Sequence, residues 1–559
     1  MIHNHEVPSS ILGPATKKAV RFQSLIAFFL CFFFVGTKKS RIFAPMKPII
    51  PIILLIALTT VVRAQDVVRL LQPAYADSGA VYRQSVYVPQ KWEKRRVVLS
   101  LERPLGATAV KVNGVVAGGD TLVNYPHQLD ITEQIVAGQR NTIEVSVAGH
   151  DAHGVMGNIE LRSQPRRLYI NKVRTHPRPF MGSVGIELEL DGQSPDFGFY
   201  DVQTMIQRDG VDTAKVFVDE REVRGSYMKY DALVLDDNRL WDEFHPNIFR
   251  LALGVGPDYQ EYTFGMREAG VVDGRLYLNR HPVYLRGCVM DDYFPLWDRM
   301  PMDEATWMHI MQRLSDYGLN HVRFRGYCPP DAAFKAADKV GMYLQPEAAS
   351  VADMNRLTDT YGHHPSLVLV TLGQDTYVYN DRVLTPVTLN QCVIAGPDML
   401  AYKQGIERVL LSGDSAHYLL AGFCDRQGDF SGVLHGRWDE ADKAPLRQFN
   451  QFCRAIVPLA KLPQGKLTAA DTLRVPVYVY NAMYGNLQGV RTSYYLASDS
   501  AKVLAGGMIA NGDVPLDSIA QVGEIVLPLD SIQAQGKVTL MVTVGNSAVR
   551  NYWNIILNR

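Results

Sequence analysis

The chain lacks any surplus of charge of one sign. Its 559 residues include 57 basic and 57 acidic side chains, so the formal net charge at pH 7 is +0. Proteins that bind nucleic acid or an acidic partner through bulk charge carry an excess of lysine and arginine. The composition therefore argues against that mode of binding, and we expect no nucleic-acid partner.

Cysteine is scarce as well. The chain has 6 cysteines, and no two of them stand at CxxC spacing. Disulfide frameworks and structural zinc sites both need cysteines in close, repeated pairs. We therefore expect mostly buried thiols, and we predict no metal site and no cofactor.

An apolar run near the N-terminus is too short to cross a membrane comfortably, and we expect no stable membrane span in the mature chain. The run that follows Met46-Lys47, PIIPIILLIAL, is too short for a span. It leads to Val62-Arg63-Ala64, which is typical of a cleavage site. We predict a signal peptide at 46–64 and a periplasmic or secreted protein. We interpret residues 1–45, which hold another apolar run, as a misassigned start; a membrane anchor is the alternative.

Three blocks of the chain show the alternation of buried β-strands. The segments 65–165 and 166–270 contain strand-length runs with period-two alternation and turn residues between them. Asn113-Gly114, after ATAVKV, is a strong hairpin-turn signal. The segment 466–559 alternates again. These blocks predict three β-sandwiches.

The segment 271–465 reads differently, because strand-like runs alternate with helical patterns. In the first helical pattern Asp303 is a candidate N-cap, and Trp307, Ile310, Met311 and Leu314 form one apolar stripe. This order is typical of parallel strands joined by helices, with the chemistry at the carboxyl ends of the strands. Polar side chains near those ends are Asp291, Asp292, Arg323, Arg325, Glu347 and Asp375.

The parallel unit is too short to be a complete eight-stranded barrel. About 180 residues run from Tyr284 to Pro463, whereas such barrels have roughly 250 residues and at least about 200. We count only five strand candidates, at 284–290, 320–327, 341–347, 367–373 and 416–423. The open edges would need cover. Another chain could cover them, the predicted loop from Thr376 to Ala395 could repack onto them, or the region could be poorly folded.

Several motifs resemble one enzyme family. PVYLRG, YGLNHVRF, GMYLQPE and HHPSLVLVTLG resemble the barrel of family 2 glycoside hydrolases of the β-galactosidase and β-glucuronidase type. The likeness is to a secreted, Bacteroidetes-type branch. Trp92, Asn113-Gly114, Asp130-Ile131-Thr132 and Gly138 to Asn141 resemble the family's sugar-binding jelly roll. The implied order is jelly roll (65–165), Ig-like sandwich (166–270), incomplete (β/α) TIM-type barrel (271–465) and C-terminal Ig-like sandwich (466–559).

The resemblance implies hydrolysis of a terminal β-linked sugar by a retaining mechanism, which needs two carboxyls about 5–5.5 Å apart. The family's acid/base is the Glu of a G-N-E motif, and this chain has Gly373-Gln374-Asp375 there. The Asp375 side chain is one methylene shorter than the Glu of the family motif. A displacement of the catalytic carboxyl by about 1 Å can cost roughly a hundredfold in rate. The segment that carries the family's nucleophile is missing, as if by an internal deletion in the barrel, and Glu347 is only a weak substitute.

The resemblance also implies a carbohydrate partner. The expected substrate-binding residues are Asp291, Asp292, Arg323, Arg325, Tyr327, Gln374 and Trp438, although Trp438 could equally be core packing. His363-His364 matches the family's N-H-P, which favours a structural role over a metal site. The sequence thus predicts a β-glycosidase-like protein with impaired catalysis, a pseudoenzyme. The alternatives are a non-catalytic carbohydrate-binding protein and a degenerate gene product, and a homo-oligomer stays open.

Overall fold

The structure is a computed structural model. It describes residues 67–70, 81–148, 154–192, 198–211, 214–223, 226–234, 236, 239–292, 294, 300–412, 417–425, 432–463, 467–468, 470–516, 518–545 and 549–558. The predicted start at 1–45 and the predicted signal peptide at 46–64 lie outside these residues. The periplasmic or secreted location therefore stays a prediction.

The first unit is a sandwich of two antiparallel sheets, and we call it the first sandwich. One sheet has the order β1-β8-β3-β6 and the other β2-β7-β4-β5. Val110 and Val112 of β4 are fully buried, whereas Lys111 between them is exposed, as the alternation predicts. The strand bounds are β1 (Val67–Leu70), β2 (Val81–Tyr87), β3 (Arg95–Pro104), β4 (Ala107–Val112), β5 (Val115–Asp120), β6 (His127–Asp130), β7 (Arg140–Ala148) and β8 (Val155–Pro165), with the short helix η1 (Gln90–Trp92).

The motif residues of the first sandwich hold its turns together. Asn113 and Gly114 join β4 to β5 with φ of 52° and 83°, which confirms the predicted hairpin turn. The Asn113 side chain donates to Oδ1 of Asn141 at 2.8 Å, and Asn141 is fully buried. Trp92 is also buried, at 1 % exposure. These residues therefore build the sandwich, and their side chains are not offered to a ligand.

The second unit is also a two-sheet sandwich, the second sandwich. Its sheets have the orders β13-β10-β9 and β12-β11-β14-β15. Ile186, Leu188, Leu251 and Leu253 are among the fully buried residues between the sheets. The bounds are β9 (Tyr169–Arg178), η2 (Pro179–Met181), β10 (Ser183–Asp191), β11 (Gly198–Arg208), β12 (Ala214–Val223), β13 (Tyr227–Leu233), β14 (Ile248–Val255) and β15 (Asp258–Gly265).

The central unit contains a five-stranded parallel sheet of order β21-β20-β19-β27-β26. A small antiparallel sheet precedes it, formed by β16 (Ala269–Val272), β17 (Arg275–Leu278) and β18 (His281–Pro282). The parallel strands are β19 (Arg286–Met290), β20 (His321–Phe324), β21 (Tyr343–Gln345), β26 (Cys392–Ile394) and β27 (Tyr418–Leu420).

The helices of this unit begin and end where the sequence predicts. They are α3 (Glu304–Asp316), α4 (Asp331–Val340), α5 (Val351–Tyr361) and α6 (Met399–Ser412). Asp303 caps α3 by accepting from the backbone N–H of Thr306 at 2.8 Å, and Ser350 caps α5 in the same way. The predicted apolar stripe of α3 is buried. Local capping and amphipathicity therefore specify these helices.

The predicted loop at 376–395 is instead largely β-structure. A second sheet of order β22-β23-β24-β25 consists of β22 (Glu347–Ala348), β23 (Leu369–Leu372), β24 (Asp375–Asn380) and β25 (Val383–Val387). β24 pairs antiparallel with β23, so this hairpin covers an edge that would otherwise be open. Of the three ways to cover the edge, the structure supports repacking of this segment.

The last unit is a sandwich with sheets β28-β30-β33 and β29-β35-β34-β31-β32. It begins with β28 (Ile456–Ala460), so it starts earlier than the predicted boundary at 466, because β28 pairs with β30. The remaining bounds are α7 (Leu446–Phe449), β29 (Leu467–Thr468), β30 (Thr472–Asn481), β31 (Leu487–Ser498), β32 (Val503–Val514), β33 (Ser518–Pro528), β34 (Gly536–Val544) and β35 (Val549–Asn558).

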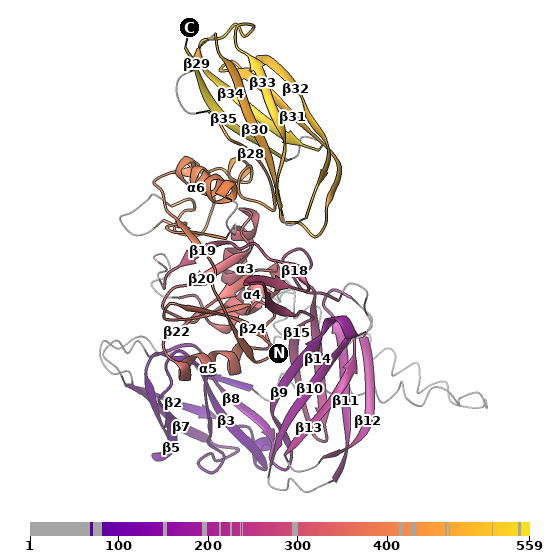
Figure 1. The fold of residues 1–559 in the computed structure, drawn as a ribbon. Coiled ribbons are helices and arrows are strands. Elements are labelled where there is room, and N and C mark those ends of the chain that lie inside the picture. Colours follow the sequence, from indigo (N-terminus) through magenta and orange to yellow (C-terminus); the bar gives the residue numbers. More distant parts are fainter. Residues whose placement is uncertain are drawn as a thin grey trace, which may run out of the picture.

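Figure 1 shows the units in an elongated arrangement. The last sandwich lies at one end, the central unit in the middle, and the first and second sandwiches together at the other end.

Arg267, in the linker after the second sandwich, is buried and donates to the carbonyls of Pro365, Leu367 and Tyr379. No helix in the part of the chain described above is both long and apolar enough to span a membrane.

Candidate functional site

The carboxyl ends of the parallel strands carry ion pairs between predicted site residues. Arg325, just after β20, makes two hydrogen bonds to the Asp291 carboxylate, at 2.7 and 2.9 Å. Nη2 of Arg323 lies 3.8 Å from Oε2 of Glu347. The structure therefore brings these four predicted residues together as two pairs. Such partly exposed pairs contribute at most about 1 kcal/mol to stability, which leaves them available to reorganise around a ligand.

The aromatic residues at this end are buried. Tyr327 is 6 % exposed, packs edge-on against Phe324, and burial raises its pKa well above the ordinary value. Trp438 is 5 % exposed and belongs to the main core of the central unit. The structure therefore favours core packing over sugar stacking for Trp438. Asp292 and Gln374 are exposed.

The pairing of strands separates Asp375 from Glu347. Glu347 pairs with Thr371, and Thr371 pairs with Thr376, so these side chains share one face of the sheet. Asp375 belongs to the neighbouring row with Leu372 and Ala348, whose side chains point to the opposite face. Gly373 and Gln374 form the tight turn from β23 into β24, and Asp375 is exposed at its end. The catalytic role of Asp375 stays a prediction. Glu347 cannot be its partner in this role, because the two side chains point to opposite faces of the sheet.

Two buried polar residues in this region were not singled out from the sequence. Arg103 of β3 reaches from the first sandwich and donates to the Cys328 carbonyl at 2.8 Å, while its Nε and Nη1 have no partner among the described residues. His321 of β20 is fully buried, and burial lowers its pKa to about 3, so the ring is neutral. The interior of the sheet also holds Gln345, which donates to Thr371 at 2.8 Å. Only the fold brings Arg103 to the strand ends, so no local pattern could have predicted it.

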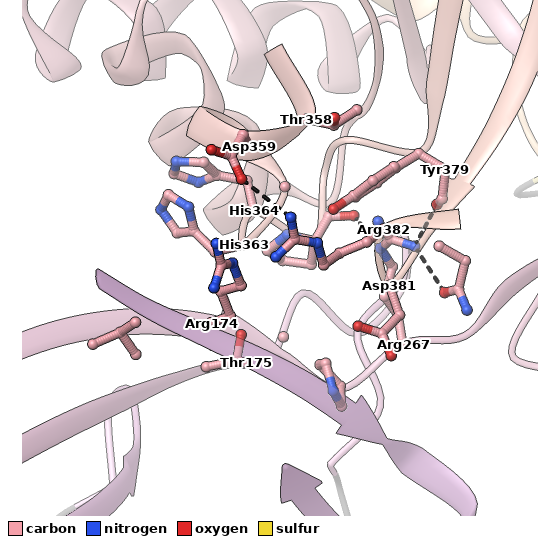
Figure 2. Close-up of a pocket in the computed structure, with 16 residues that line it drawn as sticks. Arg174, Thr175, Arg267, Thr358, Asp359, His363, His364, Tyr379, Asp381 and Arg382 are labelled. Atoms are coloured by element: carbon pink, nitrogen blue, oxygen red, sulfur yellow. Dashed lines mark hydrogen bonds and ion pairs between the residues drawn. The ribbon is translucent and has the colours of Figure 1, made fainter. Parts of the chain in front are cut away.

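A small cleft lies between the second sandwich and the central unit, and Figure 2 shows its lining. Arg174 and Thr175 of β9 face α5 and the β24–β25 hairpin across it, and Arg382 of the hairpin pairs with Asp359 of α5 at 3.2 Å. Its volume is about 60 Å³, enough for a few water molecules. This cleft is too small for a sugar. Beside it, the ion pairs of Lys172 with Asp359 and of His176 with Asp381 join the second sandwich to the central unit.

His364 lies at the back of this cleft in a network of buried charge. Its Nδ1 lies 2.6 Å from Asp338 and its Nε2 lies 3.2 Å from Asp331. Burial opposes the charged ring, but the two carboxylates outweigh burial and raise the pKa of His364 to about 9. Asp331, His363 and His364 could hold a metal ion by proximity alone. Because both His364 nitrogens already face carboxylates, the geometry fits a charged structural histidine, and the prediction of no metal is kept.

Comparison with known sequences gives one family model and a curated relative. Residues 471–557 match a domain of unknown function (DUF8488), which corresponds to the last sandwich. A β-galactosidase from Leuconostoc mesenteroides is 22% identical over 345 residues, which cover 53% of this chain and 33% of that protein. The matched part of the chain thus spans about a third of the length of this curated relative.

Solved structures match over most of the chain. A glycosyl hydrolase family 2 member from Bacteroides cellulosilyticus has a TM-score of 0.57 and 14% identity, and the match covers 87% of this chain and 80% of that one. A Bacteroides uniformis β-glucuronidase has a TM-score of 0.55 and 13% identity, with 87% and 75% covered. A putative β-galactosidase from Bacteroides fragilis has a TM-score of 0.53 and 13% identity, with 88% and 91% covered.

These similarities define a class by its fold: parallel strands and helices set among β-sandwiches, as in family 2 glycoside hydrolases. The chain has the fold of these family 2 glycoside hydrolases, and the resemblance predicted from its sequence motifs is confirmed at the level of the fold.

Proposed function

We propose that this chain binds the terminal β-linked sugar of a glycan at the carboxyl ends of its parallel strands and hydrolyses it slowly or not at all. In this proposal the first sandwich is a jelly roll, the second and last sandwiches are Ig-like, and the central unit is a shortened (β/α) barrel. Arg323, Arg325, Asp291, Asp292 and Glu347 offer the donors and acceptors for sugar hydroxyls.

The observation that carries the proposal is the placement of the carboxylates. A retaining glycosidase needs two carboxyl groups about 5–5.5 Å apart, one free to attack and one protonated. Asp291 is tied to Arg325, Glu347 lies beside Arg323, and Asp375 points to the other face of its sheet. This arrangement supports sugar binding and disfavours the double displacement.

The experiment measures turnover and binding on one preparation. We expect release of nitrophenol from aryl β-galactoside, β-glucuronide, β-glucoside and β-mannoside to be absent or far slower than about 1 s⁻¹. We expect calorimetric binding of at least one parent sugar, and Arg323→Ala should weaken it. Release of nitrophenol at a rate typical of enzymes, roughly 1–10³ s⁻¹, would overturn the proposal that catalysis is impaired. Absence of binding to all four sugars would overturn the whole proposal.

The alternative of a degenerate gene product makes a separate prediction. Three of the five cysteines in the described residues are buried, and each sandwich has its own apolar core. Such cores favour a cooperative thermal transition. A broad, non-cooperative melt of the purified protein would support the degenerate alternative instead.

A further inference from the structure

A second, much larger cleft lies where the first sandwich, the second sandwich and helices α4 and α5 meet. Its volume is about 1180 Å³, above the roughly 300–1,000 Å³ of most small-molecule pockets. None of the predicted strand-end residues lines it. The cleft is therefore separate from the site of the proposed function, and it has room for a ligand longer than one sugar ring.

One wall of the cleft is the outer face of the sheet β1-β8-β3-β6. Leu99 and Leu101 of β3 point into the core of the first sandwich, and the alternate residues Ser100 and Glu102 line the cleft. Glu160 of β8 lines it as well. A sheet face that packs directly on another domain is normally apolar. The polar side chains on this face therefore indicate contact with water or with a polar ligand.

The charges along the cleft nearly cancel. Its lining has four basic side chains, Arg69, Arg95, Arg162 and Lys335, and five acidic ones, Glu102, Glu160, Asp258, Glu261 and Asp331. The Glu160 carboxylate, for example, accepts from Arg69 at 2.9 Å and from Arg162 at 3.0 Å. A cleft for a polyanion would carry a cationic excess. The balance of charge fits a neutral ligand.

Amide side chains are the other common feature of the lining: Gln128, Asn158, Gln164, Gln203 and Gln260. An amide offers two donors and an acceptor, which match hydroxyl groups that both donate and accept. Asn158, Gln164 and Gln260 already hydrogen-bond to Glu102, Arg96 and Asp258, which leaves Gln128 and Gln203 for a ligand. The Gln203 carbonyl oxygen is buried and has no partner in the described part of the chain. Gln128 is exposed, and Tyr259 adds an aromatic ring to the wall. The Gln203 residue as a whole is half-buried and lines the cleft, so its amide group lies beside a ligand there.

We propose that this cleft binds a neutral oligosaccharide, with Gln128 and Gln203 hydrogen-bonding its hydroxyl groups. The size of the cleft, its balanced charge and its amide lining each point to an uncharged polyhydroxyl chain. A second glycan site would hold an extended polymer against the protein independently of the strand ends.

Titration calorimetry with four linear β-linked hexasaccharides, of glucose, xylose, mannose and galactose, tests the proposal. At least one should bind, and its monosaccharide should bind much more weakly. Gln128→Ala and Gln203→Ala should each weaken hexasaccharide binding by about tenfold, since each removes a hydrogen bond to the ligand. Gln139→Ala, at an exposed position of the same sandwich away from the cleft, is the matched control and should bind as the wild type does.

The experiment must distinguish binding in the large cleft from binding at the carboxyl ends of the parallel strands. Arg323→Ala should leave hexasaccharide binding unchanged, because Arg323 lies outside the cleft lining. The proposal is overturned if none of the hexasaccharides binds, or if Arg323→Ala abolishes binding while both glutamine variants keep it. The second of these outcomes would leave the proposed function of the strand ends intact.

Discussion

At the scale of single residues, the charged groups of the central unit satisfy one another. Arg325 holds Asp291, and Asp338 and Asp331 hold His364. The His364 side chain is fully buried, so its charge depends on both carboxylates. A buried charge whose partner is removed is strongly destabilising. His364 is therefore the place where the ionisation of one residue is most directly linked to folding.

The first prediction concerns the pH dependence of stability. The pKa of His364 is raised to about 9 in the folded chain, above about 6.5 for an unfolded histidine. The stabilisation is fully present below pH 6.5 and is lost as the pH rises through 9, by an amount on the order of a few kcal/mol. Urea unfolding of the wild type at pH 7.5 and pH 9.5 should show this decline, because buried histidines with lowered pKa values, such as His321 and His417, change stability only at lower pH.

Two variants and one titration check the assignment. His364→Gln should remove most of the decline, whereas His309→Gln, at a partly exposed surface ion pair with Asp439, should leave it. An NMR titration of the His364 ring in the wild type follows the same proton directly. A ring that titrates near 6.5, with an unchanged decline in His364→Gln, would contradict the prediction.

At the scale of elements, the β24–β25 hairpin packs against the parallel unit and shares a core with it. Val378 and Val387 of the hairpin pack with Leu285 and Leu369 in one core. Gln391, just before β26, donates to Gln345 on β21 at 3.2 Å. The hairpin therefore adds apolar cover to the parallel unit, and the hydrogen bond from Gln391 links the ends of the two edge strands, β26 and β21.

The second prediction concerns the turn that starts the hairpin. Gly373 has φ of +61°, a conformation that costs a residue with a Cβ roughly 1–2 kcal/mol. Gly373→Ala should lower the free energy of unfolding by about 1 kcal/mol, measured by chemical denaturation. Gly485→Ala is the matched control, because that glycine has free space around it and no positive φ. Equal stability of the two variants would count against the hairpin assignment.

The helices and most parallel strands could be predicted because their signals are local. Asp303 and Ser350 are caps, and short strand-like runs between the helices mark the parallel strands β19, β20 and β21. The β24–β25 hairpin was missed although TYVYN and VLTPV alternate around Asp381-Arg382, whose positive φ angles make the turn. Arg103 and the large cleft could not be predicted, since residues from separate units meet only in the folded chain.

At the scale of the whole molecule, buried polar contacts join the units. Glu407 of α6 accepts from Asn551 at 2.8 Å and from the indole N–H of Trp553 at 2.9 Å, both on β35. Lys403 also pairs with Glu407 and lies 4.7 Å from the Trp553 ring centre. Burial lowers the pKa of Lys403, although Glu407 opposes this. These contacts hold the last sandwich against helix α6 of the central unit.

The third prediction is that Glu407→Ala uncouples the last sandwich. The change leaves Lys403 and the Trp553 N–H without their acceptor, which should cost about 3–5 kcal/mol. Calorimetry should then resolve a separate, earlier transition. Glu524→Ala removes a surface pair with Arg474, at 3.3 Å, and should cost no more than about 1 kcal/mol. A single transition, unchanged in Glu407→Ala, would show that the units are joined by other contacts.

We propose that this chain combines the fold of a β-glycosidase with carboxylates that are not paired as a retaining mechanism requires. The most direct measurement compares hydrolysis of aryl β-galactoside and β-glucuronide by the wild type and by the Gln374→Asn, Asp375→Glu double variant, which restores the family motif. Because Asp375 points away from Glu347, we predict that the double variant is as slow as the wild type. A gain of about a hundredfold, the size of effect expected if side-chain length were the only defect, would contradict the account.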